Sequence, residues 1–340
     1  MFDKEAVALD ISEENITILI GYKHNVREGA TFKTPKGSFK NDDIVDLDAI
    51  LDVIEPYITK KKKKAKEIMF SIRGQDIIIR HLSVPNTDEK LMRENVYFEL
   101  KQFIGEKIEE YYSDFEILGY DKEDNNIANV MVVGVKKGKI DKYLEIAEEL
   151  NLQVRAIDIF ANNIGRVFKM LKTSTNQSVR LAGVLSIEGH SNSMVITELG
   201  KVVIEKYQGY GVYGANEAEL KNEHEYNKFL DSIDLNREVD EENERKYDRF
   251  FKSLVTQYKL LIQFYSTGKL KKNLDKIYLV GSANRINGIY EYLENNFEVK
   301  VGEVPNFDDL KIVVKRPKDI NLKDYLYTYG LLLRREWKYE

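Results

Sequence analysis

The sequence predicts an α/β protein of two similar lobes, with a smaller block of helices and strands inserted into the first. A strand–turn–strand unit at residues 6–34 has a counterpart at 181–207, half a chain later. Such a spacing indicates a duplicated fold rather than a solenoid, whose repeats are about 20–50 residues long. The length of 340 residues agrees with about two domains.

The composition excludes several classes of protein. The chain has 43% hydrophobic and 32% charged residues, as ordinary globular proteins do. It has no cysteine, which excludes disulfides, iron–sulfur clusters and thiol catalysis. The four histidines lack the paired spacing of a zinc site. The net charge of −5 gives no field that would attract nucleic acid, so we expect no nucleic-acid partner.

Nothing in the sequence indicates a membrane span or a secretory signal. Apolar runs are far shorter than the about 20 residues that a membrane helix needs. The first residues lack the basic start and apolar segment of a signal peptide. We therefore expect a cytoplasmic protein.

The first lobe opens with apolar and polar residues in alternation, which predicts strands at 6–11, 16–22 and 29–32. A helix follows at 46–60, because its apolar residues recur at spacings of three and four. Five lysines, 60–64, come at the end of this helix, where positive charge is favourable. A buried strand is expected at 68–72.

The inserted block is predicted as helix, strand, strand, helix over residues 83–154. Thr87 is the expected N-cap of a helix that extends to about residue 104. Strands are expected near 112–118 and 128–135, and a second helix at 140–150. A block of this size is too small for an independent enzyme and suits an interaction module.

The second lobe repeats the pattern of the first. Strands are expected at 181–187, 194–199 and 201–207, and a helical stripe at 254–265. A buried strand, 276–280, leads into a turn of small residues and then a helix at 289–297.

Six segments, in this order along the chain, resemble the actin-like ATPase superfamily. The similarity is to the PilM family of cytoplasmic type IV pilus assembly proteins, which is related to the division protein FtsA. The segments are 8–12, the inserted helix (Val84-Pro85, Glu94, Phe98-Glu99, Phe103-Ile104), 113–118, 156–159, 280–288 and 329–334.

The resemblance implies a two-lobed actin-like ATPase fold of duplicated ribonuclease H-like domains with an inserted α-β-β-α subdomain. It assigns residues 1–82, 155–178 and 325–340 to the first lobe, 1A. Residues 83–154 become the inserted subdomain, 1C, of the SHS2 type, and 179–324 the second lobe, 2A and 2B.

In this family ATP phosphates lie between two hairpin turns whose backbone N–H groups face the ligand, and aspartates hold Mg²⁺. ATP and Mg²⁺ are thus the cofactors that the resemblance implies, with Asp10 as the metal residue. The nucleotide-binding residues, if ATP binding is retained, are Asp10, Ser12, Asn15, Gly189, Ser191, Gly281, Ser282 and Ala283.

All three nucleotide motifs depart from the family pattern. Ser12 replaces a glycine, and Glu13 and Glu14 bring carboxylates into the first turn. The family's Asp-Ile-Gly reads 186–188 Ser-Ile-Glu in the second turn, and Ser282 and Ala283 replace glycines in the third. Because hydrolysis needs the phosphate turns and metal carboxylates together, we expect no catalytic residue and no ATPase activity.

The expected function is a scaffold of type IV pilus assembly. By resemblance, the chain binds the N-terminal cytoplasmic peptide of a PilN-like bitopic membrane protein, which holds it at the inner face of the membrane. In the family this peptide lies in a groove between the first lobe and the inserted subdomain. A pilus assembly ATPase is a second partner to consider.

The candidate groove residues come from segment 73–85 and helix 91–104. Val96, Leu100 and Phe103 form the stripe expected to face the subdomain's own sheet, which leaves a second stripe free for the partner. The candidate partner-binding residues are Leu91, Asn95, Phe98 and Gln102. Two alternatives stay open: an ATP-binding or hydrolysing switch, and an FtsA-like filament-forming protein.

Overall fold

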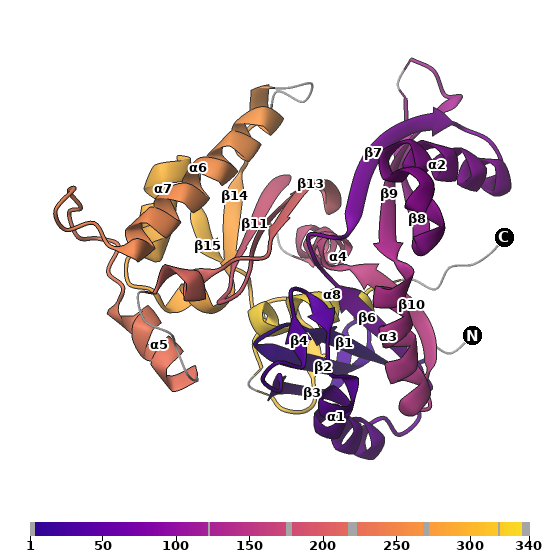
Figure 1. The fold of residues 1–340 in the computed structure, drawn as a ribbon, viewed down its shortest axis with the longest axis horizontal. Coiled ribbons are helices and arrows are strands. Elements are labelled where there is room, and N and C mark those ends of the chain that lie inside the picture. Colours follow the sequence, from indigo (N-terminus) through magenta and orange to yellow (C-terminus); the bar gives the residue numbers. More distant parts are fainter. Residues whose placement is uncertain are drawn as a thin grey trace.

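The computed structural model describes residues 4–121, 123–174, 179–216, 223–267, 272–318 and 320–334. Figure 1 shows two lobes side by side and a smaller unit that stands on the first lobe. Three sheets correspond to these parts: one of six strands, one of five and one of three.

The first lobe is built on the six-stranded sheet, whose spatial order is β10-β6-β1-β2-β3-β16. β1, β2 and β3 form an antiparallel meander, while β6 and β10 run parallel to β1. The strands are β1 (Ala6–Ile11), β2 (Asn15–Tyr22), β3 (Asn25–Lys33), β6 (Glu67–Ile72), β10 (Gln153–Ile159) and β16 (Val313–Val314). A short hairpin, β4 (Phe39–Lys40) and β5 (Asp43–Ile44), follows β3.

The second lobe repeats this plan on its five-stranded sheet, in the order β13-β12-β11-β14-β15. Again three antiparallel strands are followed by two that run parallel to the first of them. The strands are β11 (Leu181–Ile187), β12 (Asn192–Glu198), β13 (Lys201–Gln208), β14 (Lys276–Val280) and β15 (Val301–Glu303). The repeated strand–turn–strand units of the sequence are therefore equivalent parts of two lobes.

The helices cover the sheets. α1 (Leu47–Lys61) lies where the apolar spacing predicted it, and the Asp46 side chain caps it by accepting a hydrogen bond from the Ala49 N–H, 3.0 Å. The other helices of the lobes are α3 (Lys137–Glu149), α4 (Phe160–Ser174), α5 (Glu223–Ser232), α6 (Lys246–Thr267), α7 (Ile289–Phe297) and α8 (Leu326–Leu332). Short 3-10 turns are η2 (Val212–Ala215), η3 (Ser282–Arg285) and η4 (Leu322–Tyr325).

The inserted subdomain differs from the expected helix-strand-strand-helix block of 83–154. Its sheet has three antiparallel strands in the order β7-β9-β8, so it includes a strand, β7 (Ile78–Pro85), that the sequence analysis did not assign. β8 (Tyr111–Tyr120) and β9 (Ile127–Lys136) follow α2 (Glu89–Ile104) and η1 (Gly105–Glu110). The expected closing helix, α3, packs into the first lobe's core instead, through Tyr143, Ile146 and Ala147.

The chain returns to the first lobe earlier than the boundary expected at residue 325. β16 pairs in parallel with β3, where Val313 lies opposite Asn25. Residues from 313 onward therefore complete the first sheet, and α8 then packs on its central strands.

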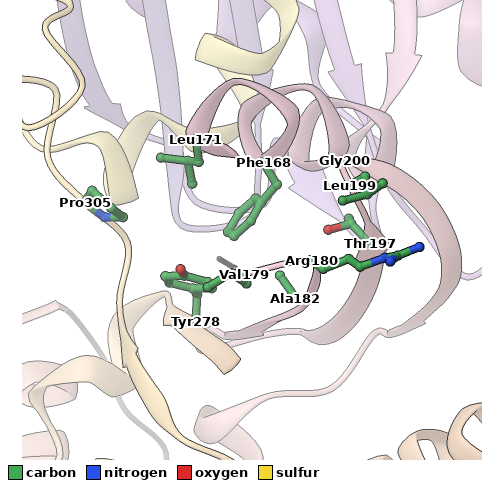
Figure 2. Close-up of a pocket in the computed structure, with 10 residues that line it drawn as sticks. All are labelled: Phe168, Leu171, Val179, Arg180, Ala182, Thr197, Leu199, Gly200, Tyr278 and Pro305. Atoms are coloured by element: carbon green, nitrogen blue, oxygen red, sulfur yellow. The ribbon is translucent and has the colours of Figure 1, made fainter. Parts of the chain in front are cut away.

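The two lobes pack together through helix α4, which contacts strands β12 and β13 of the second sheet. α4 lies against the sheet of the second lobe, where the rings of Phe168 and Tyr278 meet edge to face with centroids 5.0 Å apart. Figure 2 shows these side chains around a cavity of about 20 Å³, with Leu171 also reaching in from α4. Room for little more than one water molecule remains there, so this contact between the lobes is closely packed.

Candidate functional site

The strand topology brings three turns to one place between the lobes. The first joins β1 to β2 (residues 12–14), the second joins β11 to β12 (188–191), and the third leaves β14 (281–284). β14 runs parallel to β11, so the third turn lies beside the second. These are the three turns that carry the nucleotide motifs of the sequence, and we call this region the interlobe cleft.

Asp10, the candidate metal residue, is paired with an arginine of its own chain. Both of its carboxylate oxygens accept hydrogen bonds from the guanidinium of Arg73. Asp10 and Arg73 are both buried, with 4% and 6% exposure. The guanidinium also lies over the ring of Tyr327, 4.4 Å from its centroid. Arg73 thus provides the positive charge that a buried carboxylate requires.

A carboxylate of the first turn binds the second turn. Glu14 Oε1 accepts a hydrogen bond from the His190 backbone N–H at 2.9 Å, and it lies 3.2 Å from His190 Nδ1. Glu13 Oε1 is 3.6 Å from the other ring nitrogen. Despite burial, the hydrogen bond and charge of Glu14 raise the pKa of His190 above its ordinary value. The two lobes are tied together by this contact.

Glu188 makes the matching contact to the third turn. Its Oε2 accepts a hydrogen bond from the Ser282 backbone N–H at 3.1 Å. Burial, together with the charge of Glu14 and a hydrogen bond to it, raises the pKa of Glu188 to about 8. A carboxyl group with such a pKa holds its proton at neutral pH, which removes the repulsion between the two acidic side chains.

A stack of three rings fills the second lobe's side of the cleft. The His190 ring lies on Tyr213 with centroids 4.4 Å apart, and Tyr213 stacks on Tyr226 at 4.2 Å. The hydroxyl of Tyr226 is 2.6 Å from that of Ser282. The rings therefore link the second turn to the third.

The other candidate nucleotide residues have local partners. Ser12 and Asn15 close the first turn, since Ser12 Oγ donates to the Asn15 carbonyl at 3.0 Å and accepts from its N–H at 3.1 Å. The Ser191 carbonyl accepts from the Glu188 N–H at 2.9 Å, and Ala283 is fully buried. The structure thus brings all three motifs together.

Sequence reasoning missed the residues that fill the cleft. Arg73 could have been predicted from the sequence, because it directly follows β6. β6 runs parallel to β1, so Arg73 lies at the same end of the sheet as Asp10. Tyr213 and Tyr226 lie in a loop and a helix of the second lobe. No spacing in the sequence links either residue to the turns.

A second site is a groove of about 840 Å³ where the subdomain, the first lobe and the edge of the second lobe meet. Its size falls in the range of about 300–1,000 Å³ usual for ligand clefts. Its lining is apolar where β9, α3 and β10 face each other, through Met131, Val133, Val135, Ile140 and Ile157. Lys201 of β13 reaches across, and its Nζ donates to the Leu118 carbonyl of β8 at 2.5 Å.

An ion-pair cluster borders this groove. Asp158, at the end of β10, is bound by Arg166 of α4 and by Arg334, whose NH1 lies 2.5 Å from Asp158 Oδ2. Although burial acts to raise it, the two arginine charges lower the pKa of Asp158 below its ordinary value. The cluster holds Arg334, which follows α8, at the border of the groove.

Helix α2 lies on the opposite face of the subdomain sheet from the groove. Successive residues of a strand point to opposite faces. Val130 and Val132 pack with Met92, Val96 and Leu100 of α2, whereas the odd-numbered neighbours on β9 line the groove. Of the candidate partner residues, Leu91 and Phe98 are 46% and 62% exposed, and Gln102 is exposed as well. None of the four, Asn95 included, lines the groove.

Phe103 also departs from its expected place, since it is 55% exposed rather than packed on the sheet. Val96 and Leu100, the other two members of that stripe, are buried as expected. The free stripe of α2 and the groove are therefore two separate surfaces.

Two negative findings apply to the described ranges. No group of three or more His, Asp or Glu side chains is arranged to hold a metal ion there. Across the same residues, no helix combines the length and apolar character needed to cross a bilayer.

Known protein structures share this architecture. Among solved structures, the chain is similar to one described as the PilM-PilN type IV pilus biogenesis complex, with a TM-score of 0.77, 17% identity and 96% of each chain covered. Structures of MreB5 of Spiroplasma citri bound to ADP and to AMPPNP give TM-scores of 0.51 and 0.52 at 8% identity, over 96% of this chain and 95% of theirs. These likenesses confirm the predicted two-lobed actin-like fold.

A search of curated protein sequences finds no match. The family described as Type IV pilus assembly protein PilM, in contrast, matches residues 8–336. Because that match spans nearly the whole chain, the protein belongs to the PilM family of type IV pilus assembly proteins.

Proposed function

We propose that this protein is a scaffold of type IV pilus assembly that binds the N-terminal cytoplasmic peptide of a PilN-like bitopic membrane protein. The observation that carries the proposal is the groove of about 840 Å³ between subdomain and lobes. Family membership and the similarity to a PilM-PilN complex support the choice of partner. Binding a bitopic protein would hold the chain at the membrane.

The groove's chemistry favours a peptide with apolar side chains. Its floor carries aliphatic residues, and its buried carboxylate, Asp158, is already neutralised by Arg166 and Arg334. At the rim, Asp114 is paired with Arg93 at 3.0 Å, and Lys201 is held by a backbone carbonyl. With these charges paired within the chain, apolar pockets and backbone hydrogen bonds become the main sources of affinity, beside the charged side chains of Lys23, Glu116 and Lys169 that also line the groove.

The contact surface that we propose is therefore the groove and not the exposed face of α2. Leu91, Asn95, Phe98 and Gln102 project from a helix that the subdomain sheet separates from the groove. A peptide that lies in the groove cannot reach them through the sheet. The proposed site still lies between the first lobe and the inserted subdomain, where the family resemblance predicts it.

Calorimetric titration with the partner's N-terminal peptide tests the proposal through two variants that introduce the same charge. Val133→Lys places a lysine on the groove face of β9, and Phe98→Lys places one on the exposed face of α2. We expect the groove variant to lose at least about tenfold in affinity, as for a hot-spot contact, and Phe98→Lys to bind like the wild type. The opposite pattern would return the site to α2.

A second candidate function is an ATP-driven switch that needs Mg²⁺. It draws on the likeness to MreB5 structures that contain ADP and AMPPNP, which at 8% identity is a likeness of fold. The contacts within the interlobe cleft argue against it.

A further inference from the structure

The backbone N–H groups of the interlobe cleft are already bound by carboxyl groups of the same chain. In this fold, turns of this kind offer N–H groups to phosphate oxygens. Here the His190 N–H donates to Glu14 at 2.9 Å, and the Ser282 N–H donates to Glu188 at 3.1 Å. A carboxyl oxygen is an acceptor like a phosphate oxygen, so each donor is satisfied without a ligand.

The position of the divalent cation is also taken. Asp10 is the residue that would face Mg²⁺, and both of its oxygens are bound by Arg73. Arg73 is fixed in turn by the Tyr327 ring beneath it. A cation could reach Asp10 only by displacing a buried guanidinium.

The glycines that would let phosphates approach the backbone are crowded by protein atoms. A methyl group added to Gly189 would lie 2.2 Å from the Tyr213 ring and 2.5 Å from Glu14 Oε1. One added to Gly281 would lie 2.5 Å from the Ile187 carbonyl oxygen and 2.7 Å from Glu188 Oε1. Protein atoms therefore occupy the side-chain positions of both glycines. Because the turn donors and Asp10 are also bound within the chain, ATP with Mg²⁺ does not fit the residues present.

We propose that the interlobe cleft is liganded by its own chain, with Glu14 and Glu188 in place of phosphate oxygens and Arg73 in place of the cation. The lobes are then held together in the absence of nucleotide. In this protein the two lobes form a permanently closed frame, and Mg-ATP is neither bound nor required. This inference does not depend on the proposed peptide partner.

The first test uses the wild-type protein and Mg-ATP as the probe. A ligand present at 100 times its dissociation constant stabilises a fold enough to raise its melting temperature by several degrees. We expect no change in the midpoint of thermal unfolding up to millimolar Mg-ATP, and no heat of binding by calorimetry. A clear rise in the midpoint, or a dissociation constant in the micromolar range, would overturn the proposal.

The second test measures amide hydrogen exchange without nucleotide. Glu14→Ala should speed exchange in a peptide that contains residues 187–192, because the His190 N–H loses its acceptor. Glu188→Ala should do the same for a peptide that contains 280–284, through Ser282. Glu13→Ala is the matched control, because Glu13 is a neighbouring carboxylate that lies 3.6 Å from the His190 ring and accepts no hydrogen bond from the turn N–H groups of His190 and Ser282.

We expect the control to leave exchange in both peptides close to the wild-type rate. If Glu14→Ala and Glu188→Ala also leave these rates unchanged, the carboxyl groups do not hold the turns and the proposal is wrong. If either variant fails to fold, the wild-type titration decides the question by itself.

Discussion

At the scale of single residues, the fate of Asp10 determines what the cleft can do. An aspartate at the end of the first strand is the family's usual metal residue, yet here its charge is balanced by Arg73. The two side chains lie at the ends of adjacent parallel strands, so the pairing follows from the sheet itself. The carboxylate that would bind a metal ion in the family therefore binds a guanidinium group in this protein.

Breaking this pair should strongly destabilise the protein. Arg73→Met removes the guanidinium and leaves Asp10 as an unpaired buried charge, which costs about 3–5 kcal/mol. The double variant Arg73→Met with Asp10→Asn removes the stranded charge as well and should recover part of that loss. Urea unfolding of the wild type and both variants measures the difference. Equal stability of the single and double variants would show that the charge is not the cause.

Glu188 predicts a pH dependence of stability. Burial raises its pKa from the ordinary 4.5 to about 8 in the folded chain. Between these values the folded protein keeps a proton that the unfolded chain releases, so the free energy of unfolding falls as pH rises through this interval. Glu188→Gln should make the fall shallower. Glu205, whose pKa burial raises to about 7, contributes a fall of the same sign that the variant leaves in place.

Denaturant titrations at several pH values, on the wild type and Glu188→Gln, measure this slope. Identical slopes would mean that Glu188 titrates normally in the folded protein. In that case a proton on Glu188 could not explain why the carboxyl groups of Glu14 and Glu188 lie close together.

At the scale of elements, helix α2 has one buried face and one exposed face. Leu100 is fully buried against the subdomain sheet, whereas Phe98 is 62% exposed. Leu100→Ala should therefore cost about 2–5 kcal/mol of stability, while Phe98→Ala should change it by less than about 0.5 kcal/mol. Thermal or chemical unfolding of the two variants compares them directly. Similar losses in both would mean that Phe98 packs into the subdomain core.

The sequence predicts most elements because their signals are local. α1 could be placed from its apolar spacing, and the meanders of both lobes from alternation. β7 was missed because its exposed and half-buried residues follow no clear period. α3 was given to the subdomain because it follows β9 directly, but its apolar face packs into the first lobe. Chain order predicts neighbours, whereas packing decides which core a helix joins.

Only part of each candidate site could be predicted from the sequence. Three turns with nucleotide motifs could be expected to meet, since the duplicated strands place the first turn and the other two at equivalent ends of two separate sheets. The ring stack of Tyr213 and Tyr226 could not, because it depends on a loop and a helix with no sequence period in common. The face of α2 that is free was predicted, but the position of the groove was not, because it depends on how three parts of the molecule pack.

At the scale of the whole molecule, two regions at the junctions between its parts have opposite properties. The interlobe cleft is filled by charged and aromatic side chains of its own chain, while the groove beside the subdomain is open, with about 840 Å³ of space. The close packing of α4 on the second sheet joins the two lobes. Two joined lobes with an open groove beside them fit the proposed role of a scaffold.

Hydrogen exchange of the full chain with and without the partner's N-terminal peptide tests the central claim most directly. We predict slower exchange at 111–120, 127–136 and 157–170, the strands and helix that border the groove, with no change at 89–104. The same pattern should appear with and without Mg-ATP. Protection confined to 89–104, or protection of the groove only when Mg-ATP is present, would contradict the account.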